Sequence, residues 1–496
     1  RNYWLAVLAP VFILIVSNWF GLLDVLHSRG FLTPEALKGF NLPALSVEPY
    51  AYNWFPNRGG WSWWQGSRVL QDFRLNGSAI EIIDEFPFFT YLLSDIHPHL
   101  LGMPFVLLAI AQALNAWLGG WEKNSRLFGK QIRLSWLHSG IAVLTLGGLA
   151  FLNTWDFPFY LLLMGAAFML YRARTAGWTG KRFWELVGFG GIGGVLSIGA
   201  YLPFYLSFSS QAGGVIPSLA FFTKGKYFWI MFGPLLIPIL GFLVSRLRRI
   251  SKTSLLYGLR IAAAALVGLF AFGGALGLAS TRIEVAKNAL LGLQGAVSMG
   301  ELLKESLLRR LTAPGTWLTL FLMVWFAFSL LLEKVRTAKT DPAGIESETE
   351  VEKPRAKPTV FALLMVLVGV ILTLVPEFVY LRDQFGWRMN TIFKFYYQAW
   401  ILWSLAGAYG LVWLFTPVRQ SAKQNKWWLF ALLAASLAAC LVVLSDWGEM
   451  PLGSFGSSAL DYVMLLPGLI TLAWMIALAV KKDWRKVIGL AAAFGV

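Results

Sequence analysis

Four short polar clusters hold most of the residues whose types and spacing could support chemistry, and long apolar stretches separate them. They are Asp84-Glu85, Ser94 to His99, Asn153 to Asp156, and Tyr380 to Tyr397. Carboxylates, imidazoles and guanidiniums beside hydrocarbon are costly unless they pair, bind an ion or line a wet cavity. We therefore interpret the clusters as candidate functional segments, with helix capping as the alternative for Asp95 and Asp156.

Two histidines in the second cluster have a spacing that suits metal binding. His97 and His99 flank a proline and lie close in sequence to Asp84, Glu85 and Asp95. Imidazole nitrogens and carboxylate oxygens together are a common ligand set for a divalent metal ion. A divalent metal at His97 and His99 is therefore the candidate cofactor, and plain hydrogen bonding at a helix entrance is the alternative.

Three cations of the fourth cluster flank the start of an apolar run. Arg382, Arg388 and Lys394 supply two guanidiniums and an ammonium, which can hold a phosphate or pyrophosphate headgroup at the membrane surface. The alternatives are ion pairs with Glu377 and Asp383, or contact with anionic membrane lipids.

Tryptophans gather before the first cluster, at positions 54, 61, 63 and 64. Indole rings can stack on the C–H faces of sugars. An aromatic belt at the membrane interface explains the same residues more simply, and we favour that interpretation.

The composition excludes a water-soluble protein. Of the 496 residues, 57% are hydrophobic and only 14% are charged, whereas soluble proteins carry about 25% charged residues. Apolar runs of about 20 residues recur, which is the length that crosses ~30 Å of hydrocarbon. Their continuous character excludes a transmembrane β-barrel, whose strands alternate. The fold class is therefore all-α: a polytopic integral membrane protein with about 12–13 transmembrane helices.

Apolar runs and their breakers place the spans along the chain. The predicted spans are 4–23, 100–118, 134–154, 155–171, 184–208, 228–246, 259–280, 315–333, 359–380, 394–416, 427–445 and 459–480, with a partial thirteenth from about 487. The stretch 134–171 has basic residues on both sides, so both of its ends should be cytoplasmic. We therefore predict a hairpin broken at Asn153 to Pro158.

The basic residues also predict the orientation. The net charge is +16, from 42 Lys and Arg against 26 Asp and Glu. Most of these basic residues sit in short loops, as the positive-inside rule expects, so we exclude nucleic-acid binding. We predict a multi-pass protein of the cell (plasma) membrane with a cytoplasmic N-terminus. All four polar clusters then lie at the outer face, where segments distant in sequence can build one site.

The chain divides into two membrane blocks. The first, 1–337, contains eight spans, an acidic outer loop at 24–99 and an outer segment at 281–314 with an amphipathic helix. Residues 338–358 have the composition of a flexible cytoplasmic linker. The second block is 359–496. Because the sequence starts at Arg1 and ends in an apolar stretch, we expect that it is part of a longer chain.

Three long strings resemble a known family. They are EFPFFTYLLSDIHPHLLGMPF (85–105), FLNTWDFPFYLLL (151–163) and RDQFGWRMNTIFKFYYQAW (382–400), which look like the signature segments of the "YYY" family of highly hydrophobic membrane proteins. That family has no established activity and is distantly similar to the GT-C glycosyltransferases. The resemblance implies a GT-C-like architecture and transfer of a sugar from a polyprenyl-phosphate donor at the outer face.

The resemblance also implies roles for the clusters. Asp95, or the Asp84 and Glu85 pair, would be the general base that deprotonates an acceptor hydroxyl. The cations Arg382, Arg388 and Lys394 would stabilise the departing phosphate. The sugar would be positioned by Asn153, Trp155 and Asp156, with Tyr396 also in the binding site. Family members carry a further N-terminal membrane block, so a catalytic carboxylate upstream of Arg1 is the alternative.

A glycosyltransferase is one of three function classes that remain. The expected partners are membrane lipids and the polyprenyl-phosphate sugar donor, while the sequence does not identify which proteins, if any, bind the chain. A non-catalytic scaffold or complex subunit is the main alternative, and a lipid or sugar transporter is the other. A transporter should place ionisable residues near the membrane centre on broken helices, often in two related halves. The clustering at one face and the lack of a visible repeat favour the enzyme over the transporter.

Overall fold

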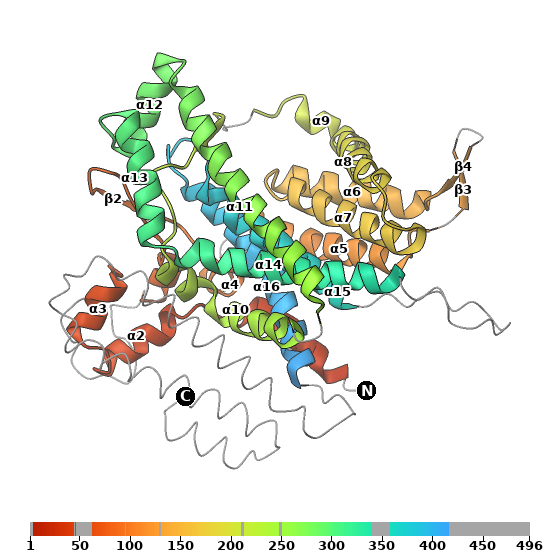
Figure 1. Ribbon diagram of the computed structural model, residues 1–496, viewed down its shortest axis with the longest axis horizontal. Helices are drawn as coiled ribbons and strands as arrows, with labels where there is room; N and C mark the ends of the chain where they lie inside the picture. The colour runs from red at the N-terminus through yellow and green to blue at the C-terminus, as the bar shows by residue number, and fades with distance from the viewer. Residues whose placement is uncertain are drawn as a thin grey trace, which may run out of the picture.

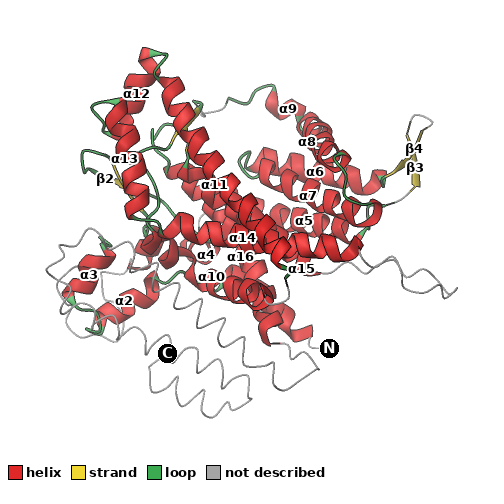
Figure 2. Cartoon of the chain, in the orientation of Figure 1, coloured by secondary structure: helices red, strands yellow, loops and turns green. Residues whose placement is uncertain are grey.

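The computed structural model describes residues 3–43, 45, 62–94, 96–122, 124–127, 130–209, 213–247, 250–339 and 358–415. Asp95, Trp54, Trp61, most of the predicted linker and the three predicted spans after residue 426 lie outside these ranges. The described chain is all-α apart from three small two-stranded sheets, which confirms the predicted fold class (Figure 2).

Helices account for most of the described residues. They are α1 (Leu8–Leu14), α2 (Phe20–Ser28), α3 (Pro34–Phe40), α4 (Pro87–Leu93), α5 (Pro98–Leu118), α6 (Trp136–Leu152), α7 (Phe157–Ala176), α8 (Lys181–Ala200), α9 (Leu202–Tyr205), α10 (Gly225–Leu247), α11 (Lys252–Ser280), α12 (Glu284–Gln294), α13 (Met299–Thr312), α14 (Gly315–Lys339), α15 (Pro358–Leu374) and α16 (Met389–Phe415). Three short 3-10 helices are η1 (Tyr3–Val7), η2 (Ser62–Ser67) and η3 (Val375–Glu377).

The strands form three antiparallel pairs. They are β1 (Gln71–Phe73) with β2 (Ala79–Glu81), β3 (Asn124–Leu127) with β4 (Lys130–Arg133), and β5 (Val215–Pro217) with β6 (Val379–Leu381). In the third pair Ile216 lies opposite Tyr380, so the loop before α10 is tied to the segment before α16. Sequence periodicity did not predict these short strands.

Six helices within the described ranges are long and apolar enough to cross a membrane. They are α5, α8, α10, α11, α14 up to Lys334, and α15 together with η3. Each coincides with a predicted span. The stretch 134–171 is also a hairpin as predicted, because α6 ends at Leu152 and α7 starts at Phe157. This chain is therefore a multi-pass membrane protein.

The first predicted span, 4–23, is wrong as a single helix. The helix α1 ends at Leu14, and α2 begins only at Phe20. Asn18 causes part of the break, because its side-chain amide donates to Gly66 O at 2.6 Å and its Oδ1 accepts from Phe20 N at 3.2 Å. These bonds tie the N-terminal segment to the loop that contains Gly66 instead of continuing the helix.

The helices form two packed groups that share one hydrophobic core (Figure 1). In the first group, α5 and α8 both pack on α6 and α7. In the second group, α10, α14, α15 and α16 pack together with α1, and α11 packs on α14. Between the groups, α7 contacts α14 and α15. Helices from both sides of the predicted linker therefore share one core.

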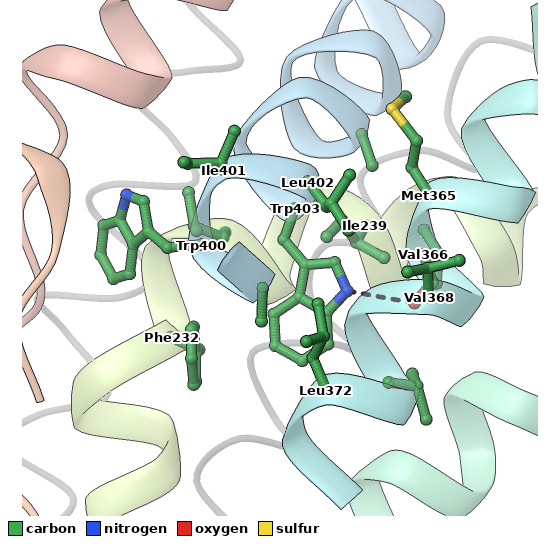
Figure 3. Close-up of a cluster of buried hydrophobic side chains, with 14 of the residues drawn as sticks. Phe232, Ile239, Met365, Val366, Val368, Leu372, Trp400, Ile401, Leu402 and Trp403 are labelled. Carbon is green, nitrogen blue, oxygen red and sulfur yellow. Dashed lines mark hydrogen bonds between the residues drawn. The ribbon is translucent and has the colours of Figure 1, made fainter. Parts of the chain in front are cut away.

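The centre of the core lies where α10, α15 and α16 meet. Trp400 and Trp403 are fully buried there, and Trp403 Nε1 donates to Val366 O at 3.2 Å (Figure 3). A Cβ on Gly369 would lie 2.2 Å from Trp403 Nε1, so this glycine allows the indole to reach α15. Large aromatic side chains thus fix the position of α16, whose N-terminal half carries the candidate site.

The amphipathic segment is two helices, α12 and α13, of which the sequence predicted the second. Leu302 of α13 is fully buried in a second, smaller core with Leu290, Leu219 and Tyr380. The predicted apolar stripe is only partly buried, because Leu307 and Leu311 are 52% and 59% exposed. One edge of α13 therefore packs on the loop before α10, with Met299 and Leu303 partly buried against the same core, and the apolar face is exposed toward its C-terminal end.

Two glycines of α11 provide a test of the helix packing. A Cβ at Gly258 would lie 2.1 Å from Ser329 Oγ and 2.9 Å from Ser329 N and Trp325 O, whereas Gly268 has open space around it. We expect Gly258→Ala to lower the free energy of unfolding by about 1–3 kcal/mol through overpacking against α14. Gly268→Ala should leave it unchanged or raise it by up to about 1 kcal/mol. Equal thermal stability of both variants in detergent would contradict the α11 and α14 contact.

Candidate functional site

Segments from the four polar clusters meet between the N-terminal ends of α5 and α16. His99, in the first turn of α5, is buried with its Nε2 3.7 Å from Glu85 Oε2. Its ring also lies 4.5 Å from the Tyr397 ring and 4.8 Å from the Phe393 ring, both on α16 (centroid distances). The first, second and fourth clusters therefore share one location.

The third cluster joins them through Asp156. This residue precedes α7, yet its side chain accepts no helix N–H, so it does not act as the helix cap. It packs against α5, where a Cβ on Gly102 would lie 3.5 Å from Asp156 Oδ2. Burial raises the pKa of Asp156 to about 7, although the neighbouring side chains of Asn153, Lys394 and Gln398 lower it.

Lys394 provides the positive charge of this site. Its Nζ lies 4.6 Å from the centre of the Trp155 ring, and Trp155 in turn contacts Phe395 edge to face with ring centroids 6.3 Å apart. Lys394 acts electrostatically on both His99 and Asp156. Because Lys394 and Trp155 are only half-buried, they form the accessible edge of an otherwise buried group.

We call this group the central polar cluster, and its members are Glu85, His99, Asn153, Trp155, Asp156, Lys394, Tyr397 and Gln398. Several of its buried polar atoms make no hydrogen bond of good geometry, among them His99 Nε2, both oxygens of Asp156 and Nε2 of Gln398. The other end of the Gln398 amide is fixed, since Tyr160 Oη donates to Gln398 Oε1 at 2.6 Å. Each buried unsatisfied polar group costs about 1–3 kcal/mol, which native proteins tolerate mainly at functional sites.

The predicted divalent metal lacks a third ligand among the residues that the structure describes. No group of three or more His, Cys, Asp or Glu side chains in those ranges could hold a metal ion. His97 and His99 instead stack on each other with ring centroids 5.2 Å apart. Asp95, the nearest other candidate ligand in sequence, lies outside the described residues.

Arg388 lies in a separate ion-pair network and not in the central polar cluster. A guanidinium has five N–H donors, and Arg388 uses all of them: two go to Asp72 at 2.6 Å each, one to Glu377 Oε1 at 2.9 Å, one to Thr223 Oγ1 at 3.1 Å and one to Pro376 O at 3.3 Å. Burial alone lowers the pKa of Arg388, but the carboxylates of Asp72 and Glu377 outweigh it and raise the pKa.

This Arg388 network agrees with the predicted ion-pair alternative, with Asp72 in the place of Asp383. Arg388 is 1% exposed and has no N–H group left for a headgroup, so we assign it to the network and not to a phosphate. Tyr396 belongs to the same network, because its hydroxyl lies 3.2 Å from Thr223 Oγ1. Tyr396 and Tyr397 thus point to different sides of α16.

Arg382 also lies apart from the central polar cluster. Its backbone pairs with the loop before β5, with Arg382 N donating to Gly214 O at 2.8 Å and Gly213 N donating to Arg382 O at 2.7 Å. Of the three cations predicted to bind phosphate, the structure brings only Lys394 to the other polar clusters.

Asp84 faces away from its neighbour Glu85. Its Oδ1 accepts from Val69 N at 3.0 Å, and the carboxyl is fully buried beside the loop that contains Val69. Trp63 and Trp64 lie in this same loop and pack on Phe89 of α4, with ring centroids 5.3 and 5.7 Å from the Phe89 ring. Asp84 and the two tryptophans therefore belong to the packing of this loop.

Asp84 should make the stability of the protein depend on pH. Burial raises its pKa to about 7, despite the Val69 N–H and the Arg68 charge, which lower it. Asp84 contributes its full stabilisation to the folded protein below about pH 4, where the carboxyl of the unfolded chain is also protonated. This contribution is lost as the pH rises to about 7, by up to about 1.4 kcal/mol per pH unit. In the Asp84→Asn variant the amide oxygen can still accept the hydrogen bond from Val69 N, and the amide group does not titrate.

We therefore expect the thermal midpoint of Asp84→Asn in detergent to fall less between pH 4 and pH 7 than that of the wild type. The control is Glu81→Gln, because the Glu81 carboxylate on β2 is 68% exposed. The thermal midpoint of this variant should change with pH as that of the wild type does. Parallel curves for the wild type and Asp84→Asn would mean that this carboxyl has an ordinary pKa in the folded protein.

Several residues of these sites were missed from the sequence. The sequence patterns do not single out Asp72 and Thr223, although Asp72 lies in the acidic segment 24–99. Arg310 of α13 is buried and donates to the carbonyls of Ser218, Leu219, Phe221 and Glu377 at 2.6–3.0 Å. Its place beside a second arginine, Arg309, in a segment of mixed charge gave no signal of burial.

Comparisons with known proteins identify a family. A family model described as "Uncharacterized membrane protein (DUF2298)" matches residues 1–403, most of the chain. No curated protein and no solved structure matches the chain.

Proposed function

We propose that this chain, which belongs to the family described as "Uncharacterized membrane protein (DUF2298)", is a membrane glycosyltransferase. Its donor would be a sugar linked to polyprenyl phosphate, and its site would lie at the outer face of the plasma membrane. The observation that carries this proposal is the convergence of Asp156, whose pKa is near 7, with Lys394 and Trp155 in one cluster. A base, a cation and an aromatic surface are the groups that such a transfer needs.

Asp156 is the general base that the described geometry supports best. A carboxylate with a pKa of about 7 can hold a proton and release it again near neutral pH, which favours general-base catalysis. Asp156 takes the proton of the acceptor hydroxyl while the acceptor oxygen bonds to the anomeric carbon. The bond between that carbon and the phosphate oxygen breaks, and the phosphate leaves with the electron pair. Asp95 remains the alternative base.

Lys394 and Trp155 would hold the donor. The Lys394 ammonium can pair with the phosphate as charge develops on its leaving oxygen, and a cation in a low-dielectric site is effective in this role. Trp155 offers an aromatic face beside that cation. Asn153 lies next to the Asp156 carboxylate, and its amide can donate a hydrogen bond to a sugar hydroxyl or accept one from it.

A carrier is the second candidate, because one observation favours it. Asp156 and His99 are 1% and 3% exposed, and buried ionisable residues in membrane proteins also mark ion or proton pathways. A carrier would move a sugar or lipid without breaking the bond to phosphate, whereas a transferase must break it.

The test measures both events in one preparation. The purified chain is placed in lipid vesicles that contain a polyprenyl-phosphate hexose with a radiolabelled sugar. We expect protein-dependent release of polyprenyl phosphate and appearance of the label in a water-soluble or acceptor-linked product. Lys394→Gln should slow this release, and Lys304→Gln, an exposed lysine of α13, should not. Movement of intact labelled lipid without release of polyprenyl phosphate would support the carrier. If neither event occurs, a non-catalytic scaffold is the function that remains.

A further inference from the structure

The turn that joins β1 to β2 carries the sequence Asn76-Gly77-Ser78. Of the 12 asparagines in the sequence, only Asn76 has a serine or threonine two positions later. An asparagine, any residue but proline, and then a serine or threonine form the acceptor pattern for N-linked glycosylation. Because this short pattern also occurs by chance, the geometry of the turn must decide whether Asn76 suits the role.

Asn76 lies at the tip of this hairpin and is exposed. Gly77 N donates to Arg74 O at 3.1 Å and Arg74 N donates to Ser78 O at 3.0 Å, so the chain reverses tightly here. Gly77 has a φ of 84°, a left-handed conformation that favours glycine. Acceptor asparagines are expected in surface turns. The Asn76 side chain is therefore displayed where another enzyme can reach it.

The serine of the pattern bonds to the asparagine side chain. Ser78 Oγ donates to Asn76 Oδ1 at 2.8 Å, and Ser78 N donates to the same oxygen at 3.1 Å. The second bond makes an Asx turn, in which an asparagine side chain bonds to the backbone two residues on. Hydrogen bonds to the amide oxygen stabilise the form whose nitrogen has lost a proton. Asn76 Nδ2 itself has no hydrogen-bond partner among the residues that the structure describes, so it can form a new bond.

The end of α12 holds the turn in place. Leu75 N donates to Gln294 O at 3.0 Å, and a Cβ on Gly295 would lie 3.2 Å from Asn76 Oδ1. The oxygen of the Asn76 amide therefore lies toward α12, which leaves the nitrogen as the atom available to a donor. The turn belongs to the segment 24–99, which the basic loops predict to lie at the outer face. N-linked glycans are typical of surface loops on that side of a membrane.

We propose that Asn76 is an acceptor for N-linked glycosylation by a separate transferase that uses a lipid-linked saccharide. Nδ2 of Asn76 bonds to the anomeric carbon of the saccharide. The bond between that carbon and the phosphate oxygen of the lipid breaks, and the phosphate leaves with the electron pair. One proton of the amide passes to a base of the transferase. This modification does not depend on the sugar transfer proposed above for the central polar cluster.

The test is peptide mass spectrometry of the full chain purified from the membrane of its source organism. We expect a peptide that contains Asn76 to carry an added saccharide mass, which fragmentation assigns to this residue. Asn76→Asp keeps an oxygen that can accept from Ser78 but removes the nitrogen, so the modification should be lost. Ser78→Ala removes the hydroxyl of the acceptor pattern and should also abolish it, whereas Ser78→Thr keeps a hydroxyl and should retain it.

Asn288→Asp is the matched control for these variants. Asn288 is an exposed asparagine of α12, the helix to which the turn is bonded. Ala289 and Leu290 follow it, so it lacks the hydroxyl of the acceptor pattern. Asn288 should carry no saccharide in the wild type, and Asn288→Asp should leave the modification of Asn76 unchanged.

Three results would overturn the proposal. An unmodified Asn76 in the wild-type chain would mean that this residue only shapes the turn. A saccharide that remains in Asn76→Asp but is lost in Ser78→Ala would be linked to the serine oxygen instead. A saccharide that remains on Asn76 in Ser78→Ala would mean that the acceptor pattern is not recognised. Because none of these measurements requires sugar transfer by this chain, they succeed or fail independently of the proposed glycosyltransferase activity.

Discussion

Asp156→Asn should reduce sugar transfer by about 10²- to 10⁴-fold, the usual cost of losing an acid-base group. The asparagine keeps the shape of the carboxylate and its neighbours Asn153 and Gln398, but it cannot accept the proton of the acceptor. Donor binding should stay close to that of the wild type, because the phosphate contact belongs to Lys394. The measurement is single-turnover release of polyprenyl phosphate by the chain in nanodiscs with prebound donor.

Asp24→Asn is the matched control for this experiment. Asp24 is another buried carboxylate, 3% exposed, but it lies on α2 outside the central polar cluster. It should keep wild-type transfer. If Asp156→Asn retains transfer and Asp95→Asn loses it, the base is Asp95 and the Asp156 carboxylate only supports the site.

Asp72→Asn should produce the largest loss of stability. The carboxylate of Asp72 takes two hydrogen bonds from Arg388 at 2.6 Å, and both side chains are 1% exposed. Removing one partner of a buried ion pair leaves an uncompensated charge and typically costs about 3–5 kcal/mol. The pair joins β1 to the start of α16, so the loss should appear as a lower thermal midpoint of the whole membrane core.

The neighbouring strand provides the control. Glu81 on β2 pairs with Arg68 at 2.7 Å, but its side chain is 68% exposed. Glu81→Gln should therefore cost less than about 1 kcal/mol. A loss in Asp72→Asn no larger than in Glu81→Gln would mean that Arg388 finds another partner or water when Asp72 is changed.

The sequence predicted the membrane helices well because their signal is local. A run of about 20 apolar residues is enough to identify a span, and basic residues on both sides were enough to divide 134–171 into α6 and α7. The first span failed because the side chain of Asn18 bonds to Gly66, which lies 48 residues away. No local pattern contains that contact.

The candidate site was predictable in part. Because the four polar clusters were predicted to lie at one membrane face, we expected them to meet. Residues from these clusters do meet, namely Glu85, His99, Asp156 and Lys394. The cations could not be sorted in the same way, because Arg388 is bound by Asp72, 316 residues away in sequence. From the sequence alone, a paired guanidinium and one that faces a ligand look the same.

The most direct test of the proposed function is an experimental structure of the chain in nanodiscs with a bound polyprenyl-phosphate hexose. The account predicts the donor phosphate within hydrogen-bond reach of Lys394 Nζ, the sugar against Trp155, and the anomeric carbon close to the Asp156 carboxylate. A donor bound elsewhere, with the side chains of the central polar cluster still closed around Asp156, would contradict it.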